Sequence, residues 1–493
     1  MSGDASTKTI TEPARQIRVV HEADVVVVGG GPGGISSAIA AARSGARTVL
    51  IERYGHLGGM ATGGLVNIIP NLSDIYGKQH LFGLTQEMID RLDARGGTSY
   101  PKKEDWGTTD KNVVEYYHDA RLDWFYIRRD YNIGKERVVY TAVVDPEILK
   151  DEFNDMVLEA GVELWLHSWG TRVVMDGNSV TGVYFESKSG RQAILGKVII
   201  DATGDGDMFV AAGADFDSEL DNKRRTAWLA FNFWLANVDI RKYDEFKASH
   251  AQKYEEMMQE LAKLDGYPYF FKGVLKNQEN VIWYHTMQPQ PESTDAMDVE
   301  QLTRIDVRAR KRALITYEFM KKHVPGFEKC FIMLTAPQLG TQGGRRIIGE
   351  YTLTEKDLET DEVFEDTVAV LANNDYREIS TKHPTLCIPY RCLVPKSIDG
   401  LLVAGRAFSS ADTINETFNI IPHCIAYGQA AGTAAAMAVD AGIQPRKVDY
   451  GELRKNLVKQ GVNLPEIEKS AAVTASAQQR SKADYYHEYT NPQ

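Results

Sequence analysis

The sequence predicts an α/β protein in which a Rossmann-like domain, with a parallel sheet and a β-meander, is interleaved with a second, α+β domain. Two observations carry this prediction. A β-branched run at 25–28 leads through a glycine-rich turn into a helix of small residues, and a second strand follows at 48–52. Runs of the same buried type return far downstream, at 198–201 and 401–406. Such runs are typical of strands covered on both faces.

The first three elements form a βαβ unit. Glycines bound the run at 25–28, the helix of small residues occupies 35–43, and Gly45 ends it. A right-handed crossover to the strand at 48–52 is the strong default for such a unit. We therefore expect the two strands to be parallel neighbours.

Later elements carry equally clear signals. Asp145 and Pro146 open a helix that Gly161 stops. A further helix begins near Pro422 and ends at Gly442. Three short strands, separated by turn residues, predict the meander at 162–166, 171–175 and 180–186.

Changes in composition suggest how the chain is divided. The first domain is expected to be discontinuous, and the segments between its parts, rich in aromatic and charged residues, form the second, which would cap it. The first domain is assigned 23–72, 140–215 and 390–447; the second is assigned 73–139 and 216–389. The polar ends, 1–22 and 465–493, are expected to be flexible.

Composition narrows the classes of function. With 56 Lys and Arg against 68 Asp and Glu, the net charge of −12 argues against nucleic acid as a partner. No run of 18 apolar residues predicts a membrane span, and the first 20 residues lack the apolar core of a secretory signal. The four cysteines form no C-x-x-C pair, so neither a metal centre nor a redox dithiol is expected. A cytoplasmic location is the expectation.

The turn after the first strand carries a dinucleotide fingerprint. Gly29 permits a tight turn, Gly31 lets the backbone approach a pyrophosphate, and Gly34 lets helix and strand pack closely. Glu52, at the end of the second strand, is placed to accept hydrogen bonds from ribose hydroxyls. This fingerprint alone leaves FAD, NAD and a bare glycine turn open.

Further glycine-rich segments favour a larger ligand. Five glycines lie between positions 55 and 64, directly after the second strand. Segment 202–207 ends a later strand, and 401–406 leads toward the helix at Pro422. An NAD site requires no such extension, so these segments point to FAD.

Taken together, the motifs resemble the FAD-dependent oxidoreductase family related to the fumarate reductase and succinate dehydrogenase flavoproteins. The resemblance runs from residue 25 to about 440, through VVVVGGGPGGISSAIAAARSGARTVLIER, LGGMATGG, VIIDATGDGD, RRIIGEYTLTEKDL, LLVAGR and IPHCIAYGQAAGTAAA. It implies a glutathione-reductase-like FAD-binding domain. The cofactor contacts that it implies are Gly29, Gly31, Pro32, Gly33, Gly34, Glu52, Arg53, Gly58, Gly59, Met60, Ala61, Thr62, Thr203, Gly204, Asp205, Gly405, Arg406 and Pro422.

The chain also departs from the family pattern. Gln342 and Gly343 stand where an Arg-Glu pair is common, and Asn419 stands where an arginine is common. His423 stands where threonine is common. These positions fall in the region expected to meet flavin or substrate. The departures therefore question the family's usual substrate contacts, and they do not question the binding of FAD.

Four residues are candidates for catalysis. His423 follows the helix proline, where the helix dipole disfavours imidazolium, so it is the first candidate for a base or donor; a capping or packing role is the alternative. Arg345 and Arg346 could clamp a carboxylate, or could instead pair with Glu350 or Asp357. The remaining candidate, Tyr390, is expected to flank the cleft together with Arg391.

Other polar and aromatic residues are weaker candidates. His285 and His383 are expected to be ordinary hydrogen-bonded histidines. His56 is the candidate for a covalent FAD link, although noncovalent FAD is preferred. The aromatic residues of segment 71–139 suggest either a substrate pocket or, the preferred interpretation, the core of the cap: Tyr76, His80, Trp106, Tyr116, Tyr117, Trp124 and Tyr126.

The expected function is oxidation of a small organic molecule at a C–H bond next to a carbonyl or carboxylate. Because only one G-x-G-x-x-G is present, substrate and electron acceptor would visit the same flavin, and oxygen, a quinone or a redox protein remain open as acceptor. The alternatives are an FAD-dependent monooxygenase and the flavoprotein subunit of an electron-transfer complex. A homo-oligomer is compatible with each.

Overall fold

The computed structural model describes residues 9–118, 123–221, 223–272, 275, 278–286, 296–374 and 378–467. Of the flexible ends predicted from the sequence, 1–8 and 468–493 lie outside these residues. The prediction for 1–22 is wrong in part, because strand β1 already begins at Arg18. Its partner β11 is 12 residues long, so β1 can extend along it until Arg18 pairs with Gln192.

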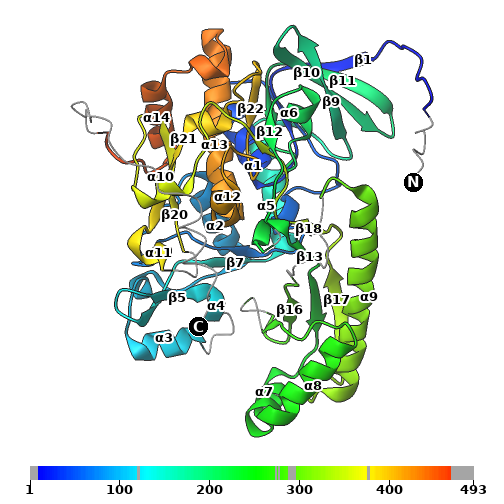
Figure 1. Cartoon of the computed structure of the whole chain (residues 1–493), viewed down its shortest axis with the longest axis vertical. Coiled ribbons are helices and arrows are strands. Elements are labelled where there is room, and N and C mark those ends of the chain that lie inside the picture. Colours follow the sequence, from blue (N-terminus) through cyan, green and yellow to red (C-terminus); the bar gives the residue numbers. More distant parts are fainter. Residues whose placement is uncertain are drawn as a thin grey trace, which may run out of the picture.

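A seven-stranded sheet forms the centre of the larger part of the molecule (Figure 1). Its order is β8-β2-β1-β11-β10-β9, and β22 also pairs with β11. Strands β8, β2, β1, β11 and β22 are parallel, whereas β9, β10 and β11 form an antiparallel meander. The predicted α/β fold class, with its parallel sheet and meander, is confirmed. The strands are β1 (Arg18–Val28), β2 (Thr48–Ile51), β8 (Glu163–Trp165), β9 (Trp169–Asp176), β10 (Ser179–Ser187), β11 (Gly190–Asp201) and β22 (Leu401–Val403).

Two helices, α1 (Pro32–Arg43) and α13 (Ile421–Ala441), pack against each other unusually closely. A Cβ atom at Gly428 would overlap the carbonyl oxygen of Gly33, and one at Gly432 would overlap that of Ser37. The contacts advance along both helices in the same direction, so the helices run parallel. Their N-termini therefore lie together at the carboxyl ends of the parallel strands.

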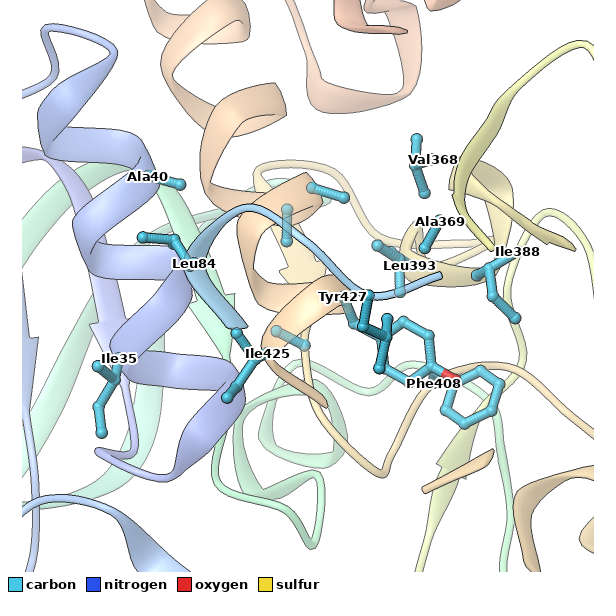
Figure 2. Packing of buried hydrophobic residues seen from close by; sticks show 14 of the residues in the cluster. Ile35, Ala40, Leu84, Val368, Ala369, Ile388, Leu393, Phe408, Ile425 and Tyr427 are labelled. Carbon is cyan, nitrogen blue, oxygen red and sulfur yellow. The ribbon is translucent and has the colours of Figure 1, made fainter. Parts of the chain in front are cut away.

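The largest hydrophobic cluster surrounds these helices (Figure 2). Ile425 and Tyr427 of α13 lie between Ile35 of α1 and the hairpin formed by β20 (Thr367–Ala372) and β21 (Thr385–Pro389). Helix α2 (Leu84–Ala94) joins the same cluster. The core therefore includes α2 and the β20–β21 hairpin, which the sequence-based division assigned to the cap. The four cysteines are buried and free.

A four-stranded antiparallel sheet forms the second, α+β part, at the lower right of Figure 1. Its order is β15-β16-β14-β17, and α7, α8 and α9 accompany it. These elements are β14 (Phe233–Ala236), β15 (Phe271–Lys272), β16 (Ile282–Tyr284), β17 (Phe331–Thr335), α7 (Ile240–Ser249), α8 (Ala251–Lys263) and α9 (Val299–His323). Short pairs link this part to the rest: β12 (Phe216–Asp217) with β19 (Arg346–Ile347), and β13 (Leu229–Ala230) with β18 (Gly340–Thr341).

The remaining elements are short or peripheral. The strands are β3 (Ile68–Ile69), β4 (Thr98–Ser99), β5 (Ile127–Asp130), β6 (Lys135–Val138) and β7 (Ala142–Val144). The helices are α3 (Lys111–Tyr117), α4 (Asp123–Tyr126), α5 (Pro146–Glu159), α6 (Asp207–Ala211), α10 (Glu355–Glu359), α11 (Ile379–Lys382), α12 (Asp412–Phe418) and α14 (Tyr450–Lys459), with 3₁₀ turns at Gly59–Ala61, Lys103–Asp105, Arg225–Ala227, Tyr390–Leu393 and Pro445–Lys447. None of the helices in the described ranges is both long and apolar enough to span a membrane.

Candidate active site

One large cavity lies at the carboxyl ends of the parallel strands and reaches the α+β part. Its volume is about 1190 Å³, above the ~300–1,000 Å³ that is usual for a single small ligand. Two groups of residues line it. The turns after β1, β2, β11 and β22 form one end, and aromatic side chains with His285 form the other. The cavity thus has room for two ligands side by side.

The turn between β1 and α1 is shaped for close approach of a ligand. Gly29 has a φ of +106°, and Gly34 packs so tightly that a Cβ there would overlap the carbonyl oxygen of Gly29. A Cβ at Gly33 would lie 2.8 Å from the backbone nitrogen of Gly405. A Cβ at Gly31, in contrast, would meet no protein atom within 4 Å, and Gly31 lines the cavity. Among the glycines of this turn, Gly31 is therefore the one that leaves space on the ligand side.

The end of β2 supplies the predicted carboxylate. Glu52 lines the cavity, and its Oε2 accepts a hydrogen bond from the Gly30 N–H at 2.5 Å. Its Oε1 accepts one from the Tyr54 N–H at 2.8 Å. These bonds fix the carboxylate beside the glycine turn. Arg53 also lines the cavity, with its guanidinium 4.9 Å from the centre of the Tyr54 ring.

The turns after β11 and β22 meet across the cavity. Thr203, Gly204, Asp205, Gly405 and Arg406 all line it. Arg406 donates to the carboxylate of Asp205, and also to Thr341 Oγ1 at 2.8 Å. This ion pair ties the two turns together.

Two carboxylates, the buried Asp201 and the half-buried Asp207, support the turn after β11. Asp201 accepts hydrogen bonds from Thr203 Oγ1 at 2.7 Å and from the Met208 N–H at 2.9 Å. Asp207 lines the cavity and pairs with Arg345 at 2.6 Å. Burial raises the pKa of Asp207 to about 6, and the negative charge of Asp201 adds to this effect.

The segment from 58 to 62 lies partly behind the cavity surface. Gly59 and Met60 line the cavity, whereas Gly58, Ala61 and Thr62 are not part of its lining. Thr62 Oγ1 donates to the Leu57 carbonyl at 2.6 Å and so holds the segment in its curved shape. His56 stacks on Tyr54, with ring centres 5.6 Å apart, and does not line the cavity.

The N-terminus of α13 completes this end. Ile420, Ile421 and Cys424 line the cavity, and Pro422 occupies the first turn behind them. The N-termini of α1 and α13 both face the cavity, so their free N–H groups and dipoles favour an anionic ligand. With the glycine turn that leaves space at Gly31, these features fit the diphosphate of a dinucleotide.

The catalytic candidates lie elsewhere. His423 is fully buried, its ring packs against Phe418 at 5.6 Å, and it does not line the cavity. Burial lowers the pKa of His423 to about 3. Tyr390 is also fully buried and donates its hydroxyl hydrogen to the Pro445 carbonyl at 3.0 Å. The expectation that these two side chains face the cleft is therefore corrected, because both are enclosed in the core.

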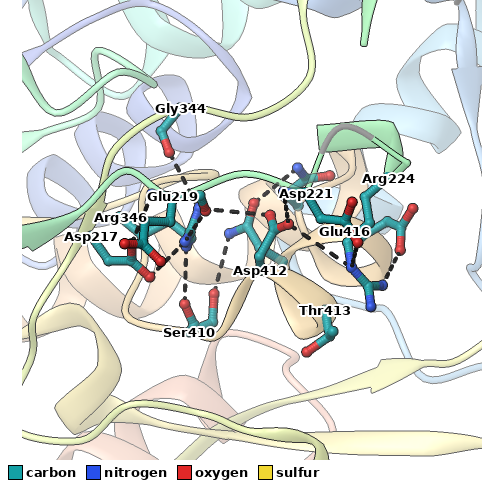
Figure 3. Close-up of polar contacts among 12 residues, drawn as sticks. Asp217, Glu219, Asp221, Arg224, Gly344, Arg346, Ser410, Asp412, Thr413 and Glu416 are labelled. Atoms are coloured by element: carbon teal, nitrogen blue, oxygen red, sulfur yellow. Dashed lines mark hydrogen bonds and ion pairs between the residues drawn. The ribbon is translucent and has the colours of Figure 1, made fainter. Parts of the chain in front are cut away.

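Arg345 and Arg346 act in ion pairs rather than at the cavity surface. Arg346 is 1% exposed and donates to Asp217 at 2.7 Å and to the Ser410 carbonyl at 3.1 Å (Figure 3). Asp412 lies 3.7 Å away. Both arginines thus form ion pairs, as the alternative interpretation expected, and neither lines the cavity where a carboxylate could be clamped. Their partners, however, are not the predicted Glu350 and Asp357. Pairing of β12 with β19 places Asp217 opposite Arg346, which the sequence does not reveal.

Two residues of the cavity were missed or undervalued. His285 follows β16 and lines the cavity; burial lowers its pKa to about 4, and the charge of Arg225 adds to this effect. Arg225, which the sequence analysis did not single out, also lines the cavity and bonds to Gln342 and Asn419. Gln342 and Asn419 are both positions where the chain departs from the family pattern. These two departures were the signal that could have drawn attention to a new polar partner such as Arg225.

The second end of the cavity is built mainly from aromatic side chains. They come from three segments: Phe125, Trp228, and Tyr267 to Phe271. Of the aromatic residues predicted in segment 71–139, those whose side chains are described do not line the cavity, and Tyr117 and Tyr126 are buried in a separate cluster with Ile127. Phe125 of the same segment does line the cavity, so the segment contributes both to a buried cluster and to the cavity wall.

Comparison with known proteins gives one match that decides the family. The family model of FAD dependent oxidoreductases matches residues 24–457, and a comparison with curated proteins gives no match.

Solved structures are only distantly similar. A geranylgeranyl bacteriochlorophyll reductase-like protein from Thermoplasma acidophilum is 15% identical over 89% of this chain and 83% of its own, with a TM-score of 0.42. The p-nitrophenol 4-monooxygenase from Pseudomonas putida DLL-E4 is 13% identical over 91% of both chains, with a TM-score of 0.41. The family model, which spans most of the chain, and the glycine cradle agree with each other: the protein belongs to the FAD dependent oxidoreductase family and is an enzyme that uses FAD.

Proposed function

We propose that this enzyme oxidises a small organic substrate at a C–H bond next to a carbonyl or carboxylate group. The observation that supports the proposal most is the continuity of the cavity, which runs from the glycine cradle to His285 and the aromatic side chains. A substrate at the second end would therefore lie next to a cofactor at the first. When bound, FAD supplies the acceptor for the hydride.

The cradle residues would hold FAD without a covalent bond. Gly29, Gly31 and Pro32 would border the diphosphate, Glu52 would accept hydrogen bonds from ribose, and Arg406 would lie beside the phosphates. The position of His56 outside the cavity lining supports noncovalent binding. Gly58, Ala61, Thr62, Gly34 and Pro422 would support the cradle from behind.

His285 is the group that we assign to proton transfer. Its pKa of about 4 keeps the imidazole neutral at pH 7, so a ring nitrogen can accept a proton. As the C–H bond breaks, its electron pair leaves with the hydride. His285 would take the proton from the neighbouring substrate atom, and the electron pair of that second bond would form the new double bond to the oxidised carbon. An anionic substrate beside the ring would raise the pKa and strengthen the base.

The finer relationship to fumarate reductase and succinate dehydrogenase flavoproteins remains part of this proposal. It rests on the ordered motifs of the sequence and suggests the type of C–H bond that is attacked. Oxygen, a quinone or a redox protein would reoxidise the flavin, and the enzyme would act on its small-molecule substrate either alone or as a homo-oligomer.

The test is anaerobic mixing of the FAD-loaded protein with a panel of carbonyl, hydroxy-acid and amine compounds while the visible flavin band is recorded. A compound that bleaches the band without NADH or NADPH supports the proposal. Bleaching by NADH or NADPH alone, followed by oxygen consumption that matches product, would instead identify a monooxygenase.

Variants test the role of His285. His285→Asn should slow bleaching by about 10²–10⁴-fold, the usual contribution of general base catalysis, with the FAD content unchanged. The exposed His250 provides a matched control, because His250→Asn should bleach at the rate of the unaltered enzyme. Equal rates for both variants would remove His285 from proton transfer.

A further inference from the structure

We propose that the side chains of Asn232 and Thr286 form a bridge that holds His285 at a fixed place relative to the glycine cradle. Asn232 is completely buried, and Thr286, the residue after His285, lines the cavity. Both are positioning residues, because they act on the reaction through His285. The inference rests on the proposed function, in which His285 is the base.

The backbone ladder between β14 and β16 ends just before His285. Its last pair is Phe233 with Tyr284, and their rings are stacked with centres 4.4 Å apart. Continuing the register by one residue places Asn232 opposite His285. Residues opposite each other in antiparallel strands share one face of the sheet, so Asn232 and His285 lie on the same side.

Beyond this last pair, side chains take the place of the backbone bonds. The Thr286 hydroxyl accepts a hydrogen bond from the Phe231 N–H at 2.9 Å and donates to the Phe231 carbonyl at 2.5 Å. The Thr286 N–H donates to Asn232 Oδ1 at 3.1 Å. The Asn232 carbonyl accepts from the N–H of Ala336, the residue after β17, at 2.8 Å. Asn232 is therefore held by its backbone toward β17 and by its side chain toward the segment that carries His285.

The other arm of the Asn232 amide reaches the cradle. Its Nδ2 donates to the Gly64 carbonyl at 2.8 Å. A Cβ at Gly64 would lie 2.1 Å from Met60 Cε and 2.9 Å from the Met60 carbonyl oxygen, so Gly64 packs directly on Met60. Met60 itself lines the cavity. One buried amide thus joins the segment of His285 to the loop that contributes Met60 to the cavity.

This link matters because the base and the flavin must reach adjacent atoms of one substrate molecule. The amide uses its acceptor on one part of the molecule and its donor on the other, and it is planar and enclosed, so it sets the spacing between them. Without it, the Thr286 N–H and the Gly64 carbonyl would both lose a partner, which buried polar groups rarely tolerate. The segment that carries His285 would therefore shift.

Flavin bleaching by an active substrate tests the bridge at saturating FAD. Asn232→Ala removes both arms, and Asn280→Ala is the matched control, because Asn280 is exposed and lies just before β16. Asn232→Ala should lower the limiting rate of bleaching by about 10²-fold, the effect of a misplacement of about 1 Å. The half-saturating substrate concentration should change little. Asn280→Ala should match the unaltered enzyme in both quantities.

A second readout requires no turnover. NMR of isotope-labelled histidine in the FAD-loaded protein follows the His285 ring between about pH 5 and pH 8, and the signal is assigned by its loss in His285→Asn. Burial lowers the pKa of His285 to about 4, so the signal should stay constant in the unaltered protein and in Asn280→Ala. In Asn232→Ala water should reach the displaced ring and raise its pKa, so the signal should titrate. Thr286→Val, which keeps the shape of the side chain but removes the hydroxyl, should do the same and serves if Asn232→Ala fails to fold.

Two outcomes would overturn the inference: bleaching by Asn232→Ala at the rate of Asn280→Ala, or a His285 signal that stays constant in both bridge variants. Loss of FAD or of thermal stability with that signal unchanged would give Asn232 a purely structural role, and would contradict the inference as well. If the signal titrates in the variants as expected but no compound bleaches the flavin, the proposed function fails and the bridge stands.

Discussion

Replacing Gly432 by alanine tests the close packing that brings the N-termini of α1 and α13 together. A Cβ at this position would lie 2.8 Å from the carbonyl carbon and 2.9 Å from the Cα of Ser37, and would overlap the Ser37 oxygen. Normal carbon contacts are about 3.5–4.0 Å, so the helices must separate by roughly 1 Å. The atoms that the added Cβ would meet belong to the backbone, which cannot adopt another rotamer as a side chain can.

The magnitude follows from two opposing effects. Overpacking of this kind costs about 1–3 kcal/mol, and a backbone obstacle places it toward the upper end. Alanine in a helix interior gains up to about 1 kcal/mol over glycine. We therefore expect Gly432→Ala to lower the free energy of unfolding by about 2 kcal/mol, and to weaken FAD binding because the N-terminus of α1 is displaced.

Urea denaturation and FAD titration measure these effects. Gly451 in α14 is the matched control, since a Cβ there meets only the Asp449 carboxylate oxygen, at 3.2 Å. Because the same oxygen caps α14 by accepting from the Glu452 N–H at 2.9 Å, Gly451→Ala should change the free energy of unfolding by no more than about 1 kcal/mol in either direction. A Gly432→Ala protein as stable as the unaltered chain, with unchanged FAD affinity, would refute the packing argument.

Three further predictions concern the cradle and its supports. Gly31→Ala should leave the urea midpoint unchanged but weaken FAD at least about tenfold, the effect of a misfit of more than ~1.4 kcal/mol, since its Cβ meets only ligand space; a lower midpoint would contradict this. Because folding raises the pKa of Asp207 to about 6, its contribution to stability is present at low pH and is lost as pH rises from about 4 to about 6. The unaltered protein should therefore lose stability relative to Asp207→Asn across that interval, and parallel stability curves would count against it. Arg346→Gln should destabilise by about 1.5–3 kcal/mol, because it removes charged hydrogen bonds of a buried guanidinium while the half-exposed Asp217 can turn to water; a variant within 1 kcal/mol, by the ~0–1 kcal/mol standard of surface pairs, would show that the pair is not structural.

Local patterns explain why the fold could be predicted. The order of strands and the two long helices follow from β-branched runs, glycine turns and capping residues, all of which act over a few neighbouring residues. Gly29, Gly31 and Gly34 have the environments that the fingerprint requires. The early start of β1 at Arg18 was missed because residues 18–22 mix polar and apolar side chains and are exposed or half-buried, so they pair with β11 without forming a buried apolar run.

The catalytic side of the cavity was harder to predict because distant segments build it. His423 follows the predicted helix proline, yet at about 100° per residue it lies roughly 100° or more around the helix from Ile421 and Cys424, which line the cavity. The sequence does not reveal which face of the helix meets the cavity, so it could not show that Ile421 and Cys424 line the cavity and His423 does not. Arg225 and His285 reach the cavity through the short β12–β19 and β13–β18 pairs and the four-stranded sheet, which leave no periodic signal.

The visible spectrum of the purified protein, before and after incubation with FAD, tests the central claim most directly. We predict a flavin band that heat denaturation releases into the supernatant, as expected for FAD held noncovalently in the glycine cradle. A band that stays with the precipitated protein would contradict noncovalent binding. No band even after incubation with FAD would contradict the account of the cradle itself.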